Sequence, residues 1–201
     1  MNQNREYRMM ELRIQTPSEE SEEKSYMVEG YASTFEPYKL ATIDNKDYFE
    51  KIEPTAFDEA DMSDVVFRVD HEGKVYARTS AGDLEVWTDE HGLGNRADLG
   101  RTQKGRELYD DIAAGHYPQM SFAFTVAEDH FDKATHTRII DRIAKVFDVS
   151  PVSWPANPTT ELSVATRAYL DGVIQEETAE RLEREKREEQ KKKIKLLLEV
   201  F

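Results

Sequence analysis

Residues 120–125 read Met-Ser-Phe-Ala-Phe-Thr and alternate between small and large side chains. In a β-strand, Ser121 and Ala123 would point to one face, and Phe122 and Phe124 to the other. The phenylalanine face predicts burial in a core. The opposite face carries a serine among small side chains, which leaves room beside its hydroxyl for a peptide. This stretch therefore indicates a fold built around β-strands.

Further strands are predicted in short runs of apolar, β-branched and aromatic residues on both sides of this stretch. They cover residues 26–35, 65–69, 75–79, 84–88, 121–127, 137–143 and 145–150. A short helix is predicted over 54–61, and a second over 102–114, with Thr102 as its N-cap and Gly115 at its end. Many short strands with few helices predict an α+β domain with a compact, barrel-like sheet.

The two ends of the chain differ from this central part. Residues 2–6 are polar and are expected to fray, and residues 17–24 are expected to form a loop. Residues 171–201 hold nearly equal numbers of acids and bases, and pairs such as Glu183–Arg187 stand four apart, which predicts a solvated helix. Its apolar tip (Ile194, Leu197, Leu198 and Phe201) either frays or docks on a partner or a second copy. We therefore divide the chain into a domain over 1–170 and a charged tail over 171–201.

The composition excludes several classes of function. The chain has 41 acidic and 27 basic residues and a net charge of −14, which argues against nucleic acid as the main partner. It contains no run of the roughly 18 apolar residues that a transmembrane helix needs and no apolar signal core, so we expect an intracellular protein without a membrane partner. The sequence has no cysteine, which excludes disulfides, thiolate metal sites and a cysteine nucleophile.

Five histidines limit the search for a general base. His71 ends the apolar run 65–69 and precedes the turn residues Glu72 and Gly73, and this fixed position suits catalysis. The other four lie in turn-like or charged stretches: His91, His116, His130 and His136. A metal-dependent hydrolase that uses these histidines is a weak alternative, because the chain has no His-Glu-x-x-His spacing. We expect no metal and no cofactor.

Asp148 is the candidate acid, in the strand-like run over residues 145–150. A carboxylate there could orient a histidine, as the acid of a serine triad does. Pro151 and the prolines that follow are expected to end the strand. Taken singly, Ser121, His71 and Asp148 are better explained by a plain strand serine, an exposed turn histidine and a surface aspartate. The Gly-x-Ser-x-Gly elbow of α/β-hydrolases is missing.

Taken together and in order, five segments resemble the prohead maturation proteases of tailed bacteriophages, the HK97 type, over about residues 11–164. They are Val-Glu-Gly-Tyr-Ala-Ser (28–33), Asp-His (70–71), Gly-Arg-Thr-Gln-Lys-Gly-Arg-Glu-Leu-Tyr (100–109), Met-Ser-Phe-Ala-Phe (120–124) and Asp-Val-Ser-Pro-Val-Ser-Trp-Pro-Ala-Asn-Pro (148–158). No single motif is specific to this family, but the occurrence of all five in the family's order is strong evidence for the resemblance. The chain departs from the family at Ala123, where glycine is common, and at Pro151, where a hydrophobic residue is usual.

The resemblance implies a serine endopeptidase that works inside the immature phage capsid in the host cytoplasm. Such enzymes cut the scaffold, or the scaffolding segment of the major capsid protein, and then digest themselves. The implied fold is similar to herpesvirus assemblins, a small β-barrel ringed by helices that is often active as a homo-oligomer.

On this match Ser121 is the nucleophile, His71 the general base and Asp148 the third member of the triad. Asp141 is the first alternative for that third place, and Asp70 a more distant one because its strand geometry should point it away from His71. Independently of the match, the segment Gly100-Arg101 precedes a predicted helix and is a candidate to stabilise the oxyanion. A non-enzymatic capsid scaffold or assembly protein is the alternative function.

Overall fold

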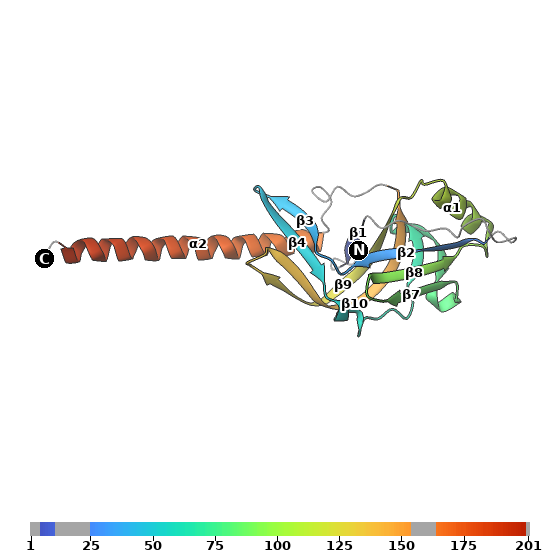
Figure 1. The fold of residues 1–201 in the computed structure, drawn as a ribbon, viewed down its shortest axis with the longest axis horizontal. Coiled ribbons are helices and arrows are strands. Elements are labelled where there is room, and N and C mark those ends of the chain that lie inside the picture. The colour runs from blue at the N-terminus through green and yellow to red at the C-terminus, as the bar shows by residue number, and fades with distance from the viewer. Residues whose placement is uncertain (1–4, 11–24, 154–163, 200–201) are drawn as a thin grey trace. The chain divides into compact units, whose positions relative to one another are not determined.

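A computed structural model of the chain describes residues 5–10, 25–153 and 164–199. The elements follow one another as β1 (Glu6–Met10), β2 (Met27–Thr34), β3 (Tyr38–Ile43), β4 (Lys46–Ile52), the 3₁₀ turn η1 (Pro54–Phe57), β5 (Val66–Val69), β6 (Glu72–Arg78), the 3₁₀ turn η2 (Thr79–Ala81), β7 (Leu84–Thr88), β8 (Gly92–Asp98), α1 (Gln103–Ala113), β9 (Gln119–Asp132), β10 (Thr137–Val152) and α2 (Val164–Glu199) (Figure 1). The chain divides into two compact units, residues 1–163 and 164–201.

The strands of the first unit form two sheets. In the larger, seven-stranded sheet the order is β1-β9-β10-β4-β3, and β5 also pairs with β10 and carries β6 on its other side. The smaller sheet has the order β2-β8-β7. The long strand β10 is the centre of the larger sheet, because it pairs antiparallel with β9 and parallel with both β4 and β5.

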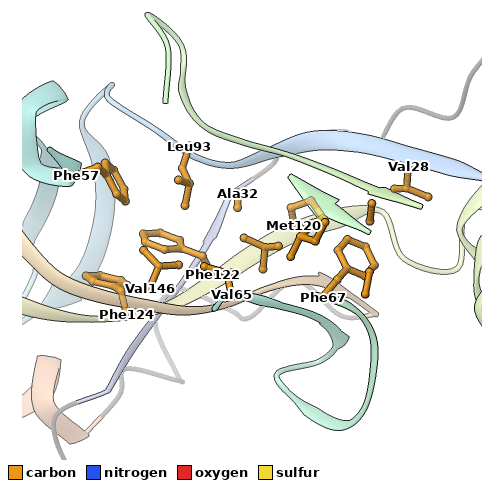
Figure 2. Packing of buried hydrophobic residues seen from close by; sticks show 14 of the residues in the cluster. Val28, Ala32, Phe57, Val65, Phe67, Leu93, Met120, Phe122, Phe124 and Val146 are labelled. Carbon is orange, nitrogen blue, oxygen red and sulfur yellow. The ribbon is translucent and has the colours of Figure 1, made fainter. Parts of the chain in front are cut away.

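The hydrophobic core lies between the two sheets. Phe122 and Met120 from β9 and Phe67 from β5 are fully buried, as are Ala32 from β2 and Leu93 from β8 on the other side (Figure 2). The rings of Phe122 and Phe124 stack with their centroids 4.4 Å apart, so both phenylalanines of the alternating stretch point to the same face, as expected. This packing fixes which face of β9 carries Ser121.

Helix α1 begins and ends as the sequence predicts. The Thr102 hydroxyl accepts a hydrogen bond from the Gly105 N–H at 3.0 Å and so caps the first turn. A Cβ at Gly105 would lie 2.2 Å from the Leu99 carbonyl oxygen, so only glycine lets the helix approach the end of β8 this closely. Leu108 and Ile112 face the core, and Gly115, at φ 83°, follows the last turn.

Strand β10 is longer than predicted. It joins the two expected segments, 137–143 and 145–150, through register shifts between Ile140 and Asp148 that let one strand bend without ending. It also runs past Pro151, which pairs with Met120, so the expectation that this proline ends the strand is wrong. Proline lacks an N–H, but its carbonyl still accepts a hydrogen bond, here from the Asp70 N–H at 3.1 Å.

Four strands were not predicted: β1, β3, β4 and β8. Charged or glycine-rich residues hide them, as in Lys46–Ile52, which carries four charged residues, one of them, Glu50, at a buried position. Asp44 and Asn45 have φ angles of 51° and 61° and join β3 to β4 as a two-residue turn with positive φ at both positions. The helix predicted over 54–61 is only the 3₁₀ turn η1.

The α+β class is confirmed, with two α-helices and mostly sheet in the described residues. Strand pairing within this part of the chain does not close into a barrel, so the barrel and the likeness to assemblins stay predictions. The second unit contains the predicted charged helix, α2, which begins at Val164, before the tail predicted over 171–201, and has ion pairs such as Glu183–Arg187 and Glu189–Lys193 along it. Ile194 is 58 % exposed; the Leu197 and Leu198 side chains and Phe201 lie outside the described residues. The helices described here include none with the length and hydropathy to span a bilayer.

Candidate active site

The structure brings Ser121, His71 and Asp148 together from three different strands or turns. His71 Nε2 lies 2.6 Å from Ser121 Oγ, and His71 Nδ1 lies 2.6 Å from Asp148 Oδ1. Ser121 and Asp148 are buried, and the His71 side chain is 14 % exposed. One imidazole therefore bridges a hydroxyl and a carboxylate through its two nitrogens, which is the arrangement that activates a serine nucleophile.

The strand pairing explains why the acid and the nucleophile meet. Asp148 on β10 lies opposite Ala123 on β9, and Ser150 lies opposite Ser121. Directly opposite residues of an antiparallel pair point to the same face, so Asp148 and Ser121 share the face that is turned away from Phe122. The core packing of the phenylalanines thus orients both catalytic candidates at once.

His71 reaches this face from a tight hairpin. Val69 pairs with Glu72, so Asp70 and His71 alone form the turn between β5 and β6, and their φ angles are 48° and 60°. A left-handed backbone is uncommon for residues other than glycine, although Asp and His tolerate it better than most. Such strained positions persist where the surrounding structure holds them, and here the strain falls on the candidate base.

Asp70 holds this turn against the end of β10. Its carboxylate accepts hydrogen bonds from the N–H and the hydroxyl of Ser153, both at 2.9 Å, and its own N–H donates to the Pro151 carbonyl. The Asp70 side chain therefore points away from His71, as its strand geometry predicts. Because β10 also carries Asp148, these bonds fix the imidazole relative to its carboxylate.

Asp148 is buried, and its hydrogen bonds are concentrated on one oxygen. Oδ1 accepts from the Ser150 hydroxyl at 2.8 Å as well as facing His71 Nδ1, whereas Oδ2 has no hydrogen-bond partner within the described residues. A buried carboxylate whose charge is incompletely solvated interacts strongly with a neighbouring positive charge. Asp148 is therefore well placed to stabilise an imidazolium at His71.

The first alternative for the acid, Asp141, lies elsewhere. Its carboxylate is 2.6 Å from His130 Nδ1 on an exposed part of the β9–β10 pair, and it raises the pKa of His130. His91 lies 3.6 Å from Asp89, and His116 lies 3.5 Å from Asp111. The remaining histidine, at position 136, packs its ring near Tyr48. The contacts of these four histidines do not involve Ser121.

The space beside the Ser121 hydroxyl is not open, because β1 covers it. Strand β1 pairs antiparallel with β9, with Met9 opposite Ser121, and the Ser121 hydroxyl donates a 2.8 Å hydrogen bond to the Arg8 carbonyl oxygen. The Tyr7 ring lies 4.7 Å from the His71 ring. The room expected beside the serine is thus filled by the chain itself, and residue 6, expected to fray, belongs to a strand.

A buried ion cluster holds β1 in this place. The Arg8 guanidinium binds both carboxylate oxygens of Glu50 on β4, and Arg138 on β10 binds Glu6 at 2.7 Å and 3.0 Å. Burial alone would raise the pKa of Glu6, but the charges of Arg8 and Arg138 outweigh it and lower that pKa to about 2. Sequence reasoning missed this cluster because its four members lie in three separate segments with no recognisable spacing.

The expected oxyanion segment is already engaged. The Gly100 N–H donates to Asp98 Oδ1 at 2.9 Å, and the Arg101 side chain donates to the carbonyls of Ala81 and Gly82. Nothing in these contacts connects the segment with Ser121.

Comparison with known proteins identifies the family. The family model described as caudovirus prohead serine protease matches residues 12–172, a range that includes Ser121, His71 and Asp148. Comparison with curated proteins and with solved structures gave no match. The family is one of serine peptidases that act in capsid maturation in the phage prohead within the host cell. The order of motifs, the serine–histidine–aspartate geometry and this match lead to one conclusion: the chain belongs to the caudovirus prohead serine proteases.

Proposed function

We propose that the protein is a serine endopeptidase in which Ser121 is the nucleophile, His71 the general base and Asp148 the acid that orients the base. The observation that carries this proposal is the imidazole of His71, which lies 2.6 Å from both Ser121 Oγ and Asp148 Oδ1. The distances are those of hydrogen bonds, as proton transfer between these groups requires.

In the first half of the reaction, Ser121 Oγ attacks the carbonyl carbon of the scissile peptide bond as His71 Nε2 takes its proton. His71 then donates this proton to the leaving amine as the C–N bond breaks, which leaves an acyl group on Ser121. In the second half, water attacks the acyl carbon, His71 takes its proton, and that proton returns to Ser121 when the ester bond breaks.

Asp148 supports both halves without exchanging a proton itself. Its Oδ1 accepts the Nδ1–H of His71, which leaves Nε2 free to act on Ser121. The Ser150 hydroxyl restricts the position of the same oxygen. When His71 is protonated, the buried carboxylate lies beside the new positive charge and stabilises it.

The substrate that we propose is the scaffold, or the scaffolding segment of the major capsid protein, inside the immature capsid. Self-digestion and a homo-oligomeric active form are part of the same proposal, which rests on family membership. The barrel-like, assemblin-type closure of the sheets is also part of this proposal. We further propose that residues 176–201, which include most of the charged helix α2, bind scaffold or mark a self-cleavage region, since the surface of α2 is mostly exposed and highly charged.

The test is cleavage by the intact chain compared with its Ser121→Ala variant. Each is produced alone and together with the capsid protein encoded beside it, and the fragments are followed by mass spectrometry. We expect fragments of the chain, the capsid protein or both with the intact chain, and a loss of at least about a thousandfold in rate with Ser121→Ala. Equal fragmentation would remove Ser121 from the mechanism. If neither chain cuts either protein, a non-enzymatic scaffold or assembly role is the better explanation.

A further inference from the structure

Strand β1 occupies the position that a peptide must take to reach the nucleophile. A peptide bond can be attacked only if its backbone lies beside Ser121, and the backbone beside Ser121 is that of residues 8 and 9. Five consecutive residue pairs, from Glu6–Phe124 to Met10–Met120, fill this edge of β9. Ser121 is consequently fully buried.

The partners of the Ser121 hydroxyl also disfavour an active serine while β1 is in place. A hydroxyl has one hydrogen, and the Ser121 hydroxyl has two acceptors within reach, the Arg8 carbonyl oxygen at 2.8 Å and His71 Nε2 at 2.6 Å. The Arg8 carbonyl therefore competes with His71 Nε2 for the serine hydrogen, and a hydrogen donated to that carbonyl is not available to the base.

We propose that β1 is an internal ligand of the active site, and that the edge of β9 it covers is the site where an extended peptide pairs once β1 has left. This inference rests on the proposed catalytic role of Ser121. It makes the folded chain latent: the Arg8 carbonyl competes with His71 for the serine hydrogen, and the Tyr7 ring covers His71.

Two features make β1 separable from the rest of the fold. It is an edge strand, so its departure breaks no other strand pair, and it lies outside residues 12–172, which carry the family match. It also brings one acid and one base into the ion cluster. When Glu6 and Arg8 leave together, Glu50 keeps its contacts with Arg138 and Tyr38, and the net charge left behind is unchanged.

The ion cluster accounts for the stability of the latent form. A charge buried without its partner is strongly unfavourable, so β1 leaves only if Glu6 and Arg8 are both released into water. The binding of a competing strand, such as a peptide of the substrate at high local concentration inside a capsid, would displace β1 by pairing with the same edge of β9.

The experiment compares two substitution pairs at the same positions of the full chain. Proline at both Tyr7 and Met9 (Tyr7→Pro with Met9→Pro) disfavours a paired strand, whereas Tyr7→Val with Met9→Val keeps a strand-forming sequence. Ser121 is then titrated with a fluorophosphonate probe. The serine oxygen forms a bond to phosphorus, fluoride leaves, and the serine proton passes to the base. Labelling of Ser121 is followed by mass spectrometry, and circular dichroism verifies that each variant is folded.

We expect the proline pair to be labelled at least about tenfold faster than the valine pair and the unsubstituted chain, because the rate follows the fraction of molecules in which β1 is undocked. Equal rates in folded proteins would overturn the inference while leaving Ser121 as the nucleophile. If no form is labelled at all, the proposed function fails, and the inference fails with it.

A reversible disulfide between β1 and β9 provides a second test that does not depend on the folding of the proline pair. Tyr7 lies opposite Ala123, and the chain has no cysteine, so Tyr7→Cys with Ala123→Cys introduces a single disulfide between β1 and β9. We expect the oxidised form to be labelled at least about tenfold more slowly than the same protein after reduction. Equal labelling in the two redox states would overturn the inference.

Discussion

The pairs His71–Asp148 and His130–Asp141 each join Nδ1 of a histidine to a carboxylate oxygen over 2.6 Å. Their surroundings differ. The side chains of the first pair are 14 % and 1 % exposed, and Ser121 lies at the other ring nitrogen; those of the second pair are 57 % and 38 % exposed. A short distance between a histidine and an acid therefore does not distinguish a catalytic pair from a surface one. The burial of the pair and the presence of Ser121 at the other ring nitrogen make that distinction.

The largest difference between the pairs is expected from neutralising each acid in turn. In the Tyr7→Pro, Met9→Pro chain, where β1 should not limit the rate, Asp148→Asn should slow fluorophosphonate labelling of Ser121 by about a thousandfold or more, because His71 loses the carboxylate that orients it. The matched control, Asp141→Asn, should stay within about twofold, since an exposed pair contributes little. Similar losses in both variants would contradict the assignment of the acid.

A smaller effect is expected from the anchor of the His71 turn. Asp70→Ala removes both hydrogen bonds to Ser153 and places alanine at a left-handed position, so the imidazole should lose its fixed orientation. We expect labelling of Ser121 to slow by roughly tenfold while the protein stays folded. Asp70→Asn keeps one acceptor oxygen and tolerates the same φ, so its labelling rate should lie between those of the Asp70→Ala variant and the chain with Asp70 unchanged. An unchanged rate in Asp70→Ala would show that the turn holds His71 without this anchor.

The smallest effect concerns the exposed pair itself. The hydrogen bond between His130 and Asp141 raises the pKa of His130, which means that the pair stabilises the fold when His130 is protonated. That contribution is present below the ordinary pKa of histidine and is lost as the pH rises through the raised value. An NMR titration should show His130 titrating above its value in the Asp141→Asn variant, with little change in melting temperature at either pH. Identical titration curves would mean that the bond does not persist in solution.

Much of the site followed from sequence because its residues lie in locally patterned segments. The alternation of Met120–Thr125 orients Ser121 whatever surrounds the strand, and both phenylalanines are buried as that pattern requires. Helix α1 was predicted from its cap and its terminating glycine, which act within one turn. The charged strands, such as β4, could not be predicted, because burial of Glu50 depends on arginines far away in the chain.

The role of β1 had no local signal at all. The segment 6–10 is short and partly charged. Its hydrogen bond with the Ser121 hydroxyl is made by the backbone carbonyl of Arg8, a group that every residue has. The role of Asp70 likewise had no local signal, because its hydrogen-bond partner, Ser153, is 83 residues away.

The sequence by itself determined the α+β class, the small-residue face that carries Ser121, the acidic character, and the order of motifs that identifies the family. These features depend on side-chain periodicity and local chemistry, which act over a few residues. Only the tertiary structure decided that Asp148 and not Asp141 faces His71, and that the chain's own first strand covers the serine. Both depend on strand register and on partners distant in sequence, and register is set by which faces are buried when the whole sheet forms.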